Sequence, residues 1–480
     1  MNRARGRLIT PALAALAAIT ILGGGLRLFR LGHESFWMEE AFSLELAKGT
    51  LSYLIERTAS DAHPPLYYML LHYWRLVFGD TEVGVRLMSV LFGTLTIPAL
   101  YRLGARLFDR PTGLVTALLY SLSVPNIGLA REARMQPLLL LLTVLSMDYF
   151  YQMVVGAKGR VFAAYVVVST LMLYTQYYGF FTLAAQGMFL GVVLVLSPSQ
   201  GRAAFWRCTS GAVLSVLLFL PWLPVFKRQL SGVEESFWIL RVKFRGLIYG
   251  VSEYAGAGAL GRIVRPIAVI GALVGLAGPI KPEARSPRLA ALYLLIWIAA
   301  VAGIPWAISQ ISSPIFLPRY AMSASLALLM LAARGLTWLP GVSTKIAATS
   351  LVVALSVAEL PAYFGDYHKD QWRVAVAHLE AAARPGDVIL FDWGAGKMPF
   401  DYYARRSDLV GIPLTIRQKN APADAADKLV VASIDGHERV WLMLSHPDPI
   451  GSVALAYLQA HYRQQSTDDV PGVMTYLFVK

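Results

Sequence analysis

The sequence has few charged residues and one cysteine, and both shortages narrow the class of protein. Lys, Arg, Asp and Glu make up 15% of the 480 residues, against roughly 25% in soluble globular proteins. Hydrophobic residues reach 56% and form many long runs, which is typical of a protein with several membrane spans. The single cysteine, Cys208, excludes a disulfide within the chain, so any exported part must fold without one.

Several common catalytic and binding motifs are also absent. The sequence has no Gly-x-Ser-x-Gly nucleophile motif and no Cys/His spacing of a metal site. The run Gly394–Lys397 matches a phosphate-binding loop only in part, because the first glycine at the required spacing and the Ser or Thr after the lysine are missing. A turn between a strand and a helix is the better interpretation of this run.

Basic charge is concentrated in the apolar part of the chain. Residues 363–480 hold 12 Lys/Arg and 14 Asp/Glu, a net charge of −2, whereas residues 1–362 hold 31 Lys/Arg and 16 Asp/Glu, a net charge of +15. Basic residues between apolar runs set the topology of membrane proteins. We therefore expect no nucleic-acid partner.

About eleven apolar runs approach the roughly 20 residues that a helix needs to cross a membrane. The first follows Arg3, Arg5 and Arg7 and lacks a convincing small-residue cleavage site, so we interpret it as a retained anchor. The predicted spans are 8–29, 85–105, 112–130, 135–155, 161–177, 180–197, 207–226, 264–280, 289–309, 320–338 and 345–362.

Basic residues fall on alternate connections between these spans, which marks the cytoplasmic side. They are Arg3, Arg5 and Arg7, then Arg102, Arg106 and Arg110, then Lys158 and Arg160, then Arg202 and Arg207, then Lys281, Arg285 and Arg288, and finally Lys345. The alternation requires that the short apolar stretch His63–Gly79, interrupted by His72 and Arg75, is an interfacial or re-entrant helix. It places residues 31–84, 126–134, 227–263 and 310–319, together with the C-terminal region, outside.

The region after Tyr363 has the pattern of a small soluble domain. Helices are predicted at 371–383, 397–404 and 453–461, and strands at 388–391, 440–444 and 474–479. Alternating helices and strands indicate an α/β layer domain. We therefore predict a transmembrane catalytic domain at 1–362 and an extracytoplasmic α/β domain at 363–480.

Four groups of residues on the predicted outer side could carry chemistry. Glu39 and Glu40 follow the first span and could accept a proton or hold a divalent cation, although loop acids at a helix start are the simpler interpretation. His63, Tyr67 and Tyr68 could bind a phosphate or belong to an aromatic belt. Arg131, Glu132 and Arg134 place three charges beside apolar runs, and Arg319–Tyr320 could grip a phosphate or anchor a helix at the interface.

The order of these groups resembles the GT-C membrane glycosyltransferases, in the branch of the protein O-mannosyltransferases and the lipid A aminoarabinose transferase. The resemblance covers roughly residues 20–340 and is strongest over 36–135. It rests on Phe36–Trp37–Met38–Glu39–Glu40–Ala41–Phe42–Ser43, His63–Pro64–Pro65–Leu66–Tyr67, Phe78–Gly79, Arg86–Leu87–Met88–Ser89 and Arg131–Glu132–Ala133–Arg134–Met135.

The resemblance implies a fold and a reaction. The fold is an all-α bundle of about eleven spans with external juxtamembrane helices, here followed by the α/β domain. The donor is a sugar on a polyprenyl phosphate, the acceptor is a lipid, glycan or protein, and the reaction takes place on the outer face of a membrane, here the bacterial plasma membrane. An acid of the first external loop is the base; the family usually shows Asp–Glu where this chain has Glu39–Glu40, so either glutamate is a candidate.

The remaining site residues follow from this mechanism. Arg134, Arg319, His63 and Tyr320 are predicted to bind the donor phosphate. Glu132 is predicted to orient Arg134 or to share a divalent metal ion with Glu39. A lipid or sugar transporter without transferase activity is the alternative, and it predicts inverted repeats and helices broken near the membrane centre; a scaffold or sensor that presents the C-terminal domain is a further one.

Overall fold

The computed structural model describes residues 11–236, 241–279, 286–366, 369–392, 394–414, 425–445 and 449–480. Arg3, Arg5, Arg7, Lys281 and Arg285, which entered the topology prediction, lie outside the described residues. By its internal contacts the chain divides into two units. The first comprises residues 1–29, 55–67 and 86–363, and the second comprises 30–54, 68–85 and 364–480.

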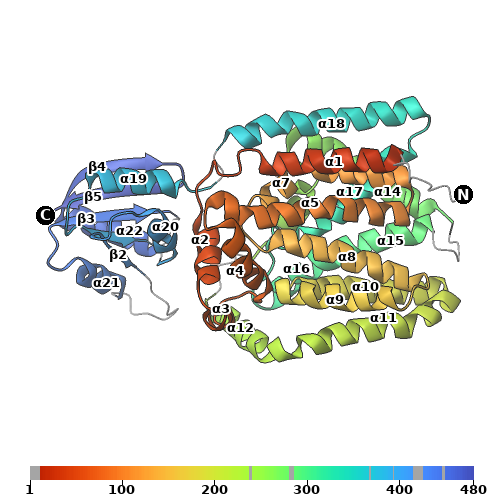
Figure 1. Ribbon diagram of the computed structural model, residues 1–480, viewed down its shortest axis with the longest axis horizontal. Coiled ribbons are helices and arrows are strands. Elements are labelled where there is room, and N and C mark those ends of the chain that lie inside the picture. Colours follow the sequence, from red (N-terminus) through yellow and green to blue (C-terminus); the bar gives the residue numbers. More distant parts are fainter. Residues whose placement is uncertain are drawn as a thin grey trace, which may run out of the picture. The chain divides into compact units, whose positions relative to one another are not determined.

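The first unit is a bundle of long apolar helices that run side by side (Figure 1). Its elements are α1 (Pro11–Leu28), α5 (Glu82–Leu107), α6 (Arg110–Leu122), α7 (Val124–Ala130), α8 (Gln136–Val154), α9 (Arg160–Thr175), α10 (Gly179–Leu196), α11 (Pro198–Phe219), α12 (Leu223–Ser236), α13 (Phe244–Glu253), α14 (Gly258–Ala277), α15 (Pro287–Ile298), α16 (Ile304–Ile311), α17 (Ser323–Trp338) and α18 (Val342–Gly365).

Each of the eleven predicted spans contains a helix. Among the described residues, eight helices are long and apolar enough to cross a membrane, and the count is nine if the bent pair α6–α7 is one span. The helices α9 and α17 are shorter and apolar. The span predicted at 112–130 is not one straight helix: α6 and α7 meet at an angle of 65°. Pro125, in the first turn of α7, cannot donate the backbone hydrogen bond that would continue α6.

The helix α17 lies at the centre of the bundle and is buried along most of its length. It packs against α14 so closely that a Cβ atom on Gly271 would lie 1.9 Å from the Leu331 carbonyl oxygen, and one on Gly335 would lie 2.2 Å from that of Ile267. Only glycine fits at these two positions. Because helices in a membrane associate mainly through close packing, these contacts hold the bundle together.

The stretch predicted to be interfacial forms α4 (Leu66–Phe78), which is too short for a span. Its Arg75 donates through Nε to Oδ1 of Asp80 at 2.6 Å, and this bond lowers the pKa of the Asp80 carboxyl. Other short helices, α2 (Met38–Lys48), α3 (Leu51–Ala59), α12 and α13, occupy the connections where juxtamembrane helices were expected.

The second unit contains a five-stranded sheet with the strand order β2-β1-β3-β5-β4. Strand β1 is parallel to β2 and β3, and β5 is antiparallel to β3 and β4. The strands are β1 (Val388–Phe391), β2 (Val410–Pro413), β3 (Arg439–Leu444), β4 (Arg463–Val470) and β5 (Val473–Val479). The helices are α19 (Trp372–Ala382), α20 (Lys397–Tyr403), α21 (Ala425–Ile434) and α22 (Pro449–His461).

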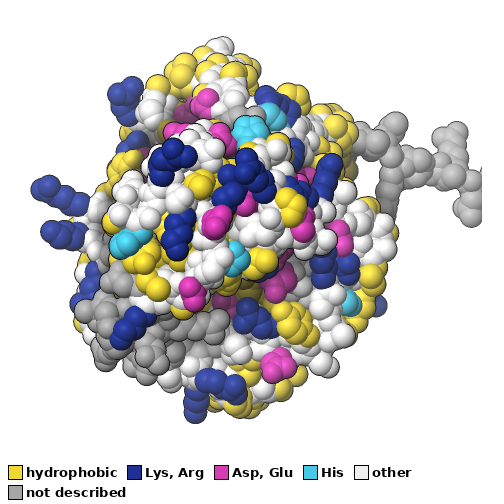
Figure 2. All heavy atoms as spheres, turned by 90° about the vertical axis from the view of Figure 1, so that its left-hand side faces the viewer, with side chains coloured by type: hydrophobic (Ala, Val, Ile, Leu, Met, Phe, Trp, Pro, Cys, Tyr) yellow, Lys and Arg dark blue, Asp and Glu magenta, His cyan; other side chains and the backbone are white. Residues whose placement is uncertain are grey.

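Helices cover both faces of this sheet. One core contains side chains of α19 and α20 such as Trp372 and Phe400, and the other contains side chains of α21 and α22 such as Val430 and Leu458. Gly394–Gly396 form a 3₁₀ turn that leads from β1 into α20, as expected for a strand-to-helix turn. The face seen in Figure 2 carries charged side chains of both signs. The predicted fold class is confirmed.

Candidate functional site

Three of the sequence motifs meet in the first unit through a chain of hydrogen bonds. The hydroxyls of Tyr67 and Ser89 lie 3.2 Å apart, and Ser89 Oγ donates to the backbone carbonyl of Arg134 at 3.2 Å. Tyr67 and Ser89 are completely buried. The motifs around His63, Arg86 and Arg131 therefore lie together in the fold, although 71 residues separate His63 from Arg134.

The same contacts place Arg134 beside His63. The Arg134 guanidinium is buried, with 3% of the residue exposed, and its Nη2 lies 3.5 Å from Nε2 of His63. The His63 ring meets Tyr320 edge to face with the ring centroids 5.9 Å apart, and Tyr320 meets Tyr178 in the same way at 5.7 Å. All four predicted donor-binding residues, His63, Arg134, Arg319 and Tyr320, thus belong to one unit.

Arg319 and Glu132 form an ion pair. Arg319 Nη2 donates to Glu132 Oε2 at 3.0 Å, and both side chains are partly exposed. Glu132 is thus placed to orient Arg319; its predicted orientation of Arg134 and its predicted sharing of a metal ion with Glu39 stay predictions. Arg131, the other arginine of this motif, donates to the backbone carbonyl of Phe29 and lies over the Tyr363 ring.

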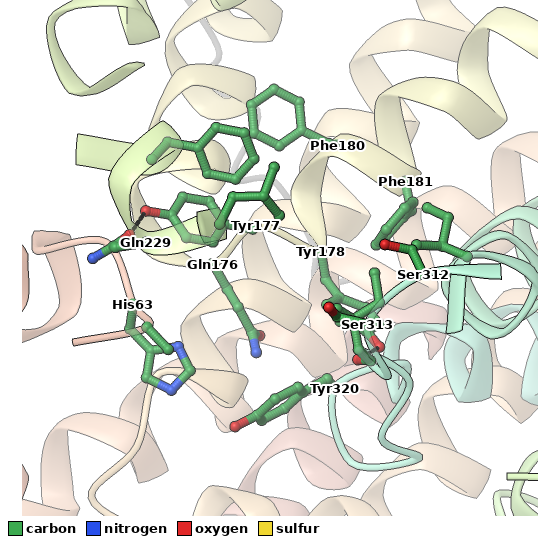
Figure 3. A pocket seen from close by; sticks show the side chains of 15 residues that line it. His63, Gln176, Tyr177, Tyr178, Phe180, Phe181, Gln229, Ser312, Ser313 and Tyr320 are labelled. Carbon is green, nitrogen blue, oxygen red and sulfur yellow. Dashed lines mark hydrogen bonds between the residues drawn. The ribbon is translucent and has the colours of Figure 1, made fainter. Parts of the chain in front are cut away.

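A cavity of about 470 Å³ adjoins the cluster formed by His63, Arg134, Arg319, Glu132 and Tyr320 (Figure 3). Its walls are mostly aromatic and apolar, with Tyr177, Tyr178, Phe180, Phe181 and Phe226 among the lining residues. His63 and Tyr320 line it at the charged cluster. An apolar cavity that borders on cations can hold an amphipathic molecule with an anionic head.

Gln176 is a polar group in the wall of this cavity that the sequence reasoning missed. It is 2% exposed, and neither atom of its amide has a hydrogen-bond partner within the described structure. Figure 3 shows the amide end between His63 and Tyr320. By contrast, Tyr177 donates to Gln229, whose amide nitrogen donates to the Thr58 carbonyl at 2.7 Å, and Tyr178 donates to the Ile315 carbonyl at 2.9 Å. An amide within the aromatic run Tyr174–Tyr178 was the available signal in the sequence.

The two candidate bases lie in the second unit, in the first turn of α2. Carboxylates are favourable at this position because the start of a helix carries partial positive charge. Glu40 is fully buried, and its Oε2 accepts from Lys369 Nζ at 3.0 Å. Glu39 is only partly buried. The structure therefore distinguishes two residues that the sequence left equivalent.

Glu39 and Glu132, which were predicted to share a divalent metal ion, belong to different units, and this sharing stays a prediction. Among the residues that the structure describes, no group of three or more His, Cys, Asp or Glu side chains is placed to bind a metal. Glu132 is engaged by Arg319, and Glu40 by Lys369. We derive no chemical step through a metal ion.

Comparison with known proteins gives a family match and a fold. Residues 62–224 match the family described as dolichyl-phosphate-mannose-protein mannosyltransferase. An uncharacterized protein of Aquifex aeolicus is 27% identical over 180 residues, which is 36% of this chain and 36% of that relative's length.

Solved structures cover nearly the whole chain. ArnT from Cupriavidus metallidurans in the apo state has a TM-score of 0.65 at 14% identity over 97% of both chains, and its complex with undecaprenyl phosphate has 0.62 at 14% over 98% of both. The archaeal oligosaccharyltransferase AglB from Archaeoglobus fulgidus, with an inhibitory peptide and a dolichol-phosphate, has 0.57 at 12% over 97% of this chain and 74% of its own. An AglB structure in complex with Zn and sulfate has 0.51 at 13% over 89% of this chain and 67% of its own. The chain has the GT-C fold, and the resemblance to GT-C membrane glycosyltransferases is confirmed.

Proposed function

We propose that this integral membrane protein is a glycosyltransferase that moves a sugar from a polyprenyl-phosphate donor to a lipid, glycan or protein acceptor on the outer face of the bacterial plasma membrane. The observation that carries the proposal is the aromatic cavity lined by His63 and Tyr320. Arg134 lies beside His63, and Arg319, which precedes Tyr320 in the sequence, pairs with Glu132. A polyprenyl phosphate has the matching chemistry, with an apolar chain and an anionic head. The bound undecaprenyl phosphate of the ArnT complex supports this choice of ligand class.

The reaction is a displacement at the anomeric carbon of the sugar. The acceptor oxygen forms a bond to this carbon, while the bond from the carbon to the phosphate oxygen breaks and the polyprenyl phosphate leaves. Glu39 takes the acceptor proton as general base. Arg134 and Arg319, with His63 and Tyr320, offset the negative charge that grows on the leaving phosphate. No nucleotide is required, since the lipid carrier already activates the sugar.

The test compares wild type with three single variants, Glu39→Gln, Glu40→Gln and Glu45→Gln, purified in detergent. Each receives radiolabelled polyprenyl-phosphate sugars, with a total membrane extract of lipids, glycans and proteins as acceptor. Glutamine keeps the shape but cannot take a proton, so Glu39→Gln should lower turnover by about 10²-fold or more at normal expression. Glu45 is an exposed acid of the same helix and serves as the matched control.

One result would contradict the proposed function, and another would contradict only the proposed base. Wild type without transfer from any polyprenyl-phosphate sugar would remove the glycosyltransferase function. Near-normal turnover in both Glu39→Gln and Glu40→Gln would leave the function standing and remove these acids from the mechanism.

A further inference from the structure

The segment that carries the candidate base belongs to the same structural unit as the C-terminal region. Residues 30–54 and 68–85 cluster with residues 364–480 by internal contacts. The central link is the ion pair between Lys369 and Glu40, which lie 329 residues apart in the sequence. The Glu40 side chain is 0% exposed and that of Lys369 is 9% exposed.

Further bonds fix the residues just before α2. The Phe36 backbone N–H donates to the Tyr403 hydroxyl at 2.6 Å, and that hydroxyl donates to Glu82 Oε1 at 2.7 Å. Burial and this bond to Glu82 raise the pKa of Tyr403, so the hydroxyl stays protonated at neutral pH and keeps both bonds.

Arg373 adds a second set of bonds from the C-terminal region. Its backbone N–H donates to Ser35 Oγ at 3.1 Å, and its guanidinium donates to the Gly32 carbonyl at 3.1 Å and to Glu82 at 2.6 Å. The start of α2 is therefore held at Gly32, Ser35, Phe36 and Glu40 by residues 369–403.

We propose that the C-terminal region positions the base, and that Lys369 is the positioning residue that sets Glu39 through Glu40. The inference rests on the proposed function, in which Glu39 takes the acceptor proton. Successive residues of an α-helix point about 100° apart, so an anchor on Glu40 also fixes the direction of Glu39. A buried carboxylate without a countercharge is strongly unfavourable, and Lys369 supplies that charge.

A buried ion pair is weak grounds for a purely stabilising role. Replacing both partners by neutral groups often leaves stability unchanged or raises it, whereas removing one partner leaves a buried charge. The best-attested use of such pairs is to fix one arrangement among several. For this pair the arrangement is the orientation of the first turn of α2.

The experiment uses four full-length variants: Lys369→Met, Lys369→Arg, the double variant Lys369→Met/Glu40→Gln, and Lys428→Met. Lys428 is an exposed lysine on α21 of the same unit and is the matched control. The measurements are kcat, the donor KM, the thermal midpoint, and amide hydrogen exchange over residues 38–48.

Lys369→Met should lower kcat by about 10- to 100-fold, the effect of a small misplacement of a catalytic group, with little change in donor KM and faster exchange in α2. Lys369→Arg keeps the charge and should recover most of the turnover. The double variant should recover the thermal midpoint but keep a reduced kcat, because it removes the Glu40 charge that Lys369 balanced without restoring the anchor. Lys428→Met should behave as wild type in all four measurements.

The inference is overturned if Lys369→Met is folded and turns over as wild type, or if the double variant recovers full kcat. It is also overturned if exchange over residues 38–48 is unchanged in Lys369→Met. The exchange measurement does not depend on activity, so it tests the anchor even if wild type shows no transfer. In that case the failure belongs to the proposed function alone.

Discussion

Arg134 and Arg319 sit in different surroundings, and these surroundings predict how each tolerates substitution. Arg134 is 3% exposed beside His63, whereas the Arg319 side chain is 27% exposed and paired with Glu132. If both offset charge on the leaving phosphate, their effect appears in turnover and in donor binding. If they only anchor helix ends at the interface, their effect appears in membrane yield.

Arg134→Ala and Arg319→Ala should each lower kcat/KM by about 10²- to 10³-fold, the range measured when one donor to a developing charge is removed. Lysine keeps the charge but loses the planar fork, so Arg→Lys should leave partial activity with a raised donor KM. Steady-state kinetics and donor binding on the purified variants measure both effects, with Arg228→Ala, an exposed arginine on α12, as control. Full activity in the lysine variants, with only a lower yield in the alanine variants, would assign both residues to anchoring.

Gln176 should affect function and stability in opposite directions. Both atoms of its buried amide lack a hydrogen-bond partner within the described structure, so leucine at this position removes an unfavourable group from the protein. The thermal midpoint of Gln176→Leu should be unchanged or higher. If the amide bonds the polar part of the donor, the donor KM should rise about 3- to 10-fold, the value of one hydrogen bond. An unchanged KM would remove Gln176 from donor recognition.

At the scale of elements, the sequence predicted those parts whose side chains are buried in a regular pattern. The bundle helices are long apolar runs, and β1, β3 and β5 have apolar side chains in the core. Strand β4, Arg463–Val470, was not predicted because its polar side chains are almost all exposed. It is an edge strand held by backbone pairing with β5, which leaves no periodicity in the sequence. The short edge strand β2 and the helix α21 were missed as well.

The residues of the candidate site likewise divide into those that the sequence makes identifiable and those that it does not. His63, Glu132, Arg134 and Arg319 were identifiable because charged or polar residues beside apolar runs are conspicuous. Lys369 and Gln176 were not, because the role of each depends on a neighbour brought close only by the fold. Likewise, the contact between Gly335 and α14 follows from the distance between two helices, and a glycine in an apolar run does not show which helix it touches.

At the scale of the whole molecule, side-chain contacts define the two ends of the helix bundle. Near the end of α8, Asp148 is paired with Arg102 and Arg106 at 2.8 and 2.7 Å, and Arg207 donates to the Met153 carbonyl. The start of α8 adjoins Arg134, at the opposite end of the same helix. The basic connections therefore gather at one end of the first unit, and the candidate phosphate site lies at the other.

The last helix of the bundle, α18, connects these two ends. Arg334, near the end of α17, lies 3.5 Å from Asp109, which places the turn before α18 at the basic end. Tyr363, near the end of α18, lies under the Arg131 guanidinium at 5.7 Å from the ring centroid. The chain thus leaves the bundle at the end that carries the site. Since basic connections are retained in the cytoplasm, the site and everything after Tyr363 should face outward.

Reporter fusions after Lys158, Pro282 and Lys480 test this orientation. A reporter active only in the cytoplasm should be active after Lys158 and Pro282 and inactive after Lys480, and one active only outside should give the reverse. Exchanging Arg102 and Arg106 for glutamine should weaken the bias, because it removes two of the charges that hold this end inside. The exchange also leaves Asp148 without its two arginine partners. A cytoplasmic signal after Lys480 in wild type would place residues 364–480 and Arg134 inside the cell. A transfer reaction on the outer face cannot take place there. This result would therefore overturn both the orientation and the assignment of the reaction to the outer face.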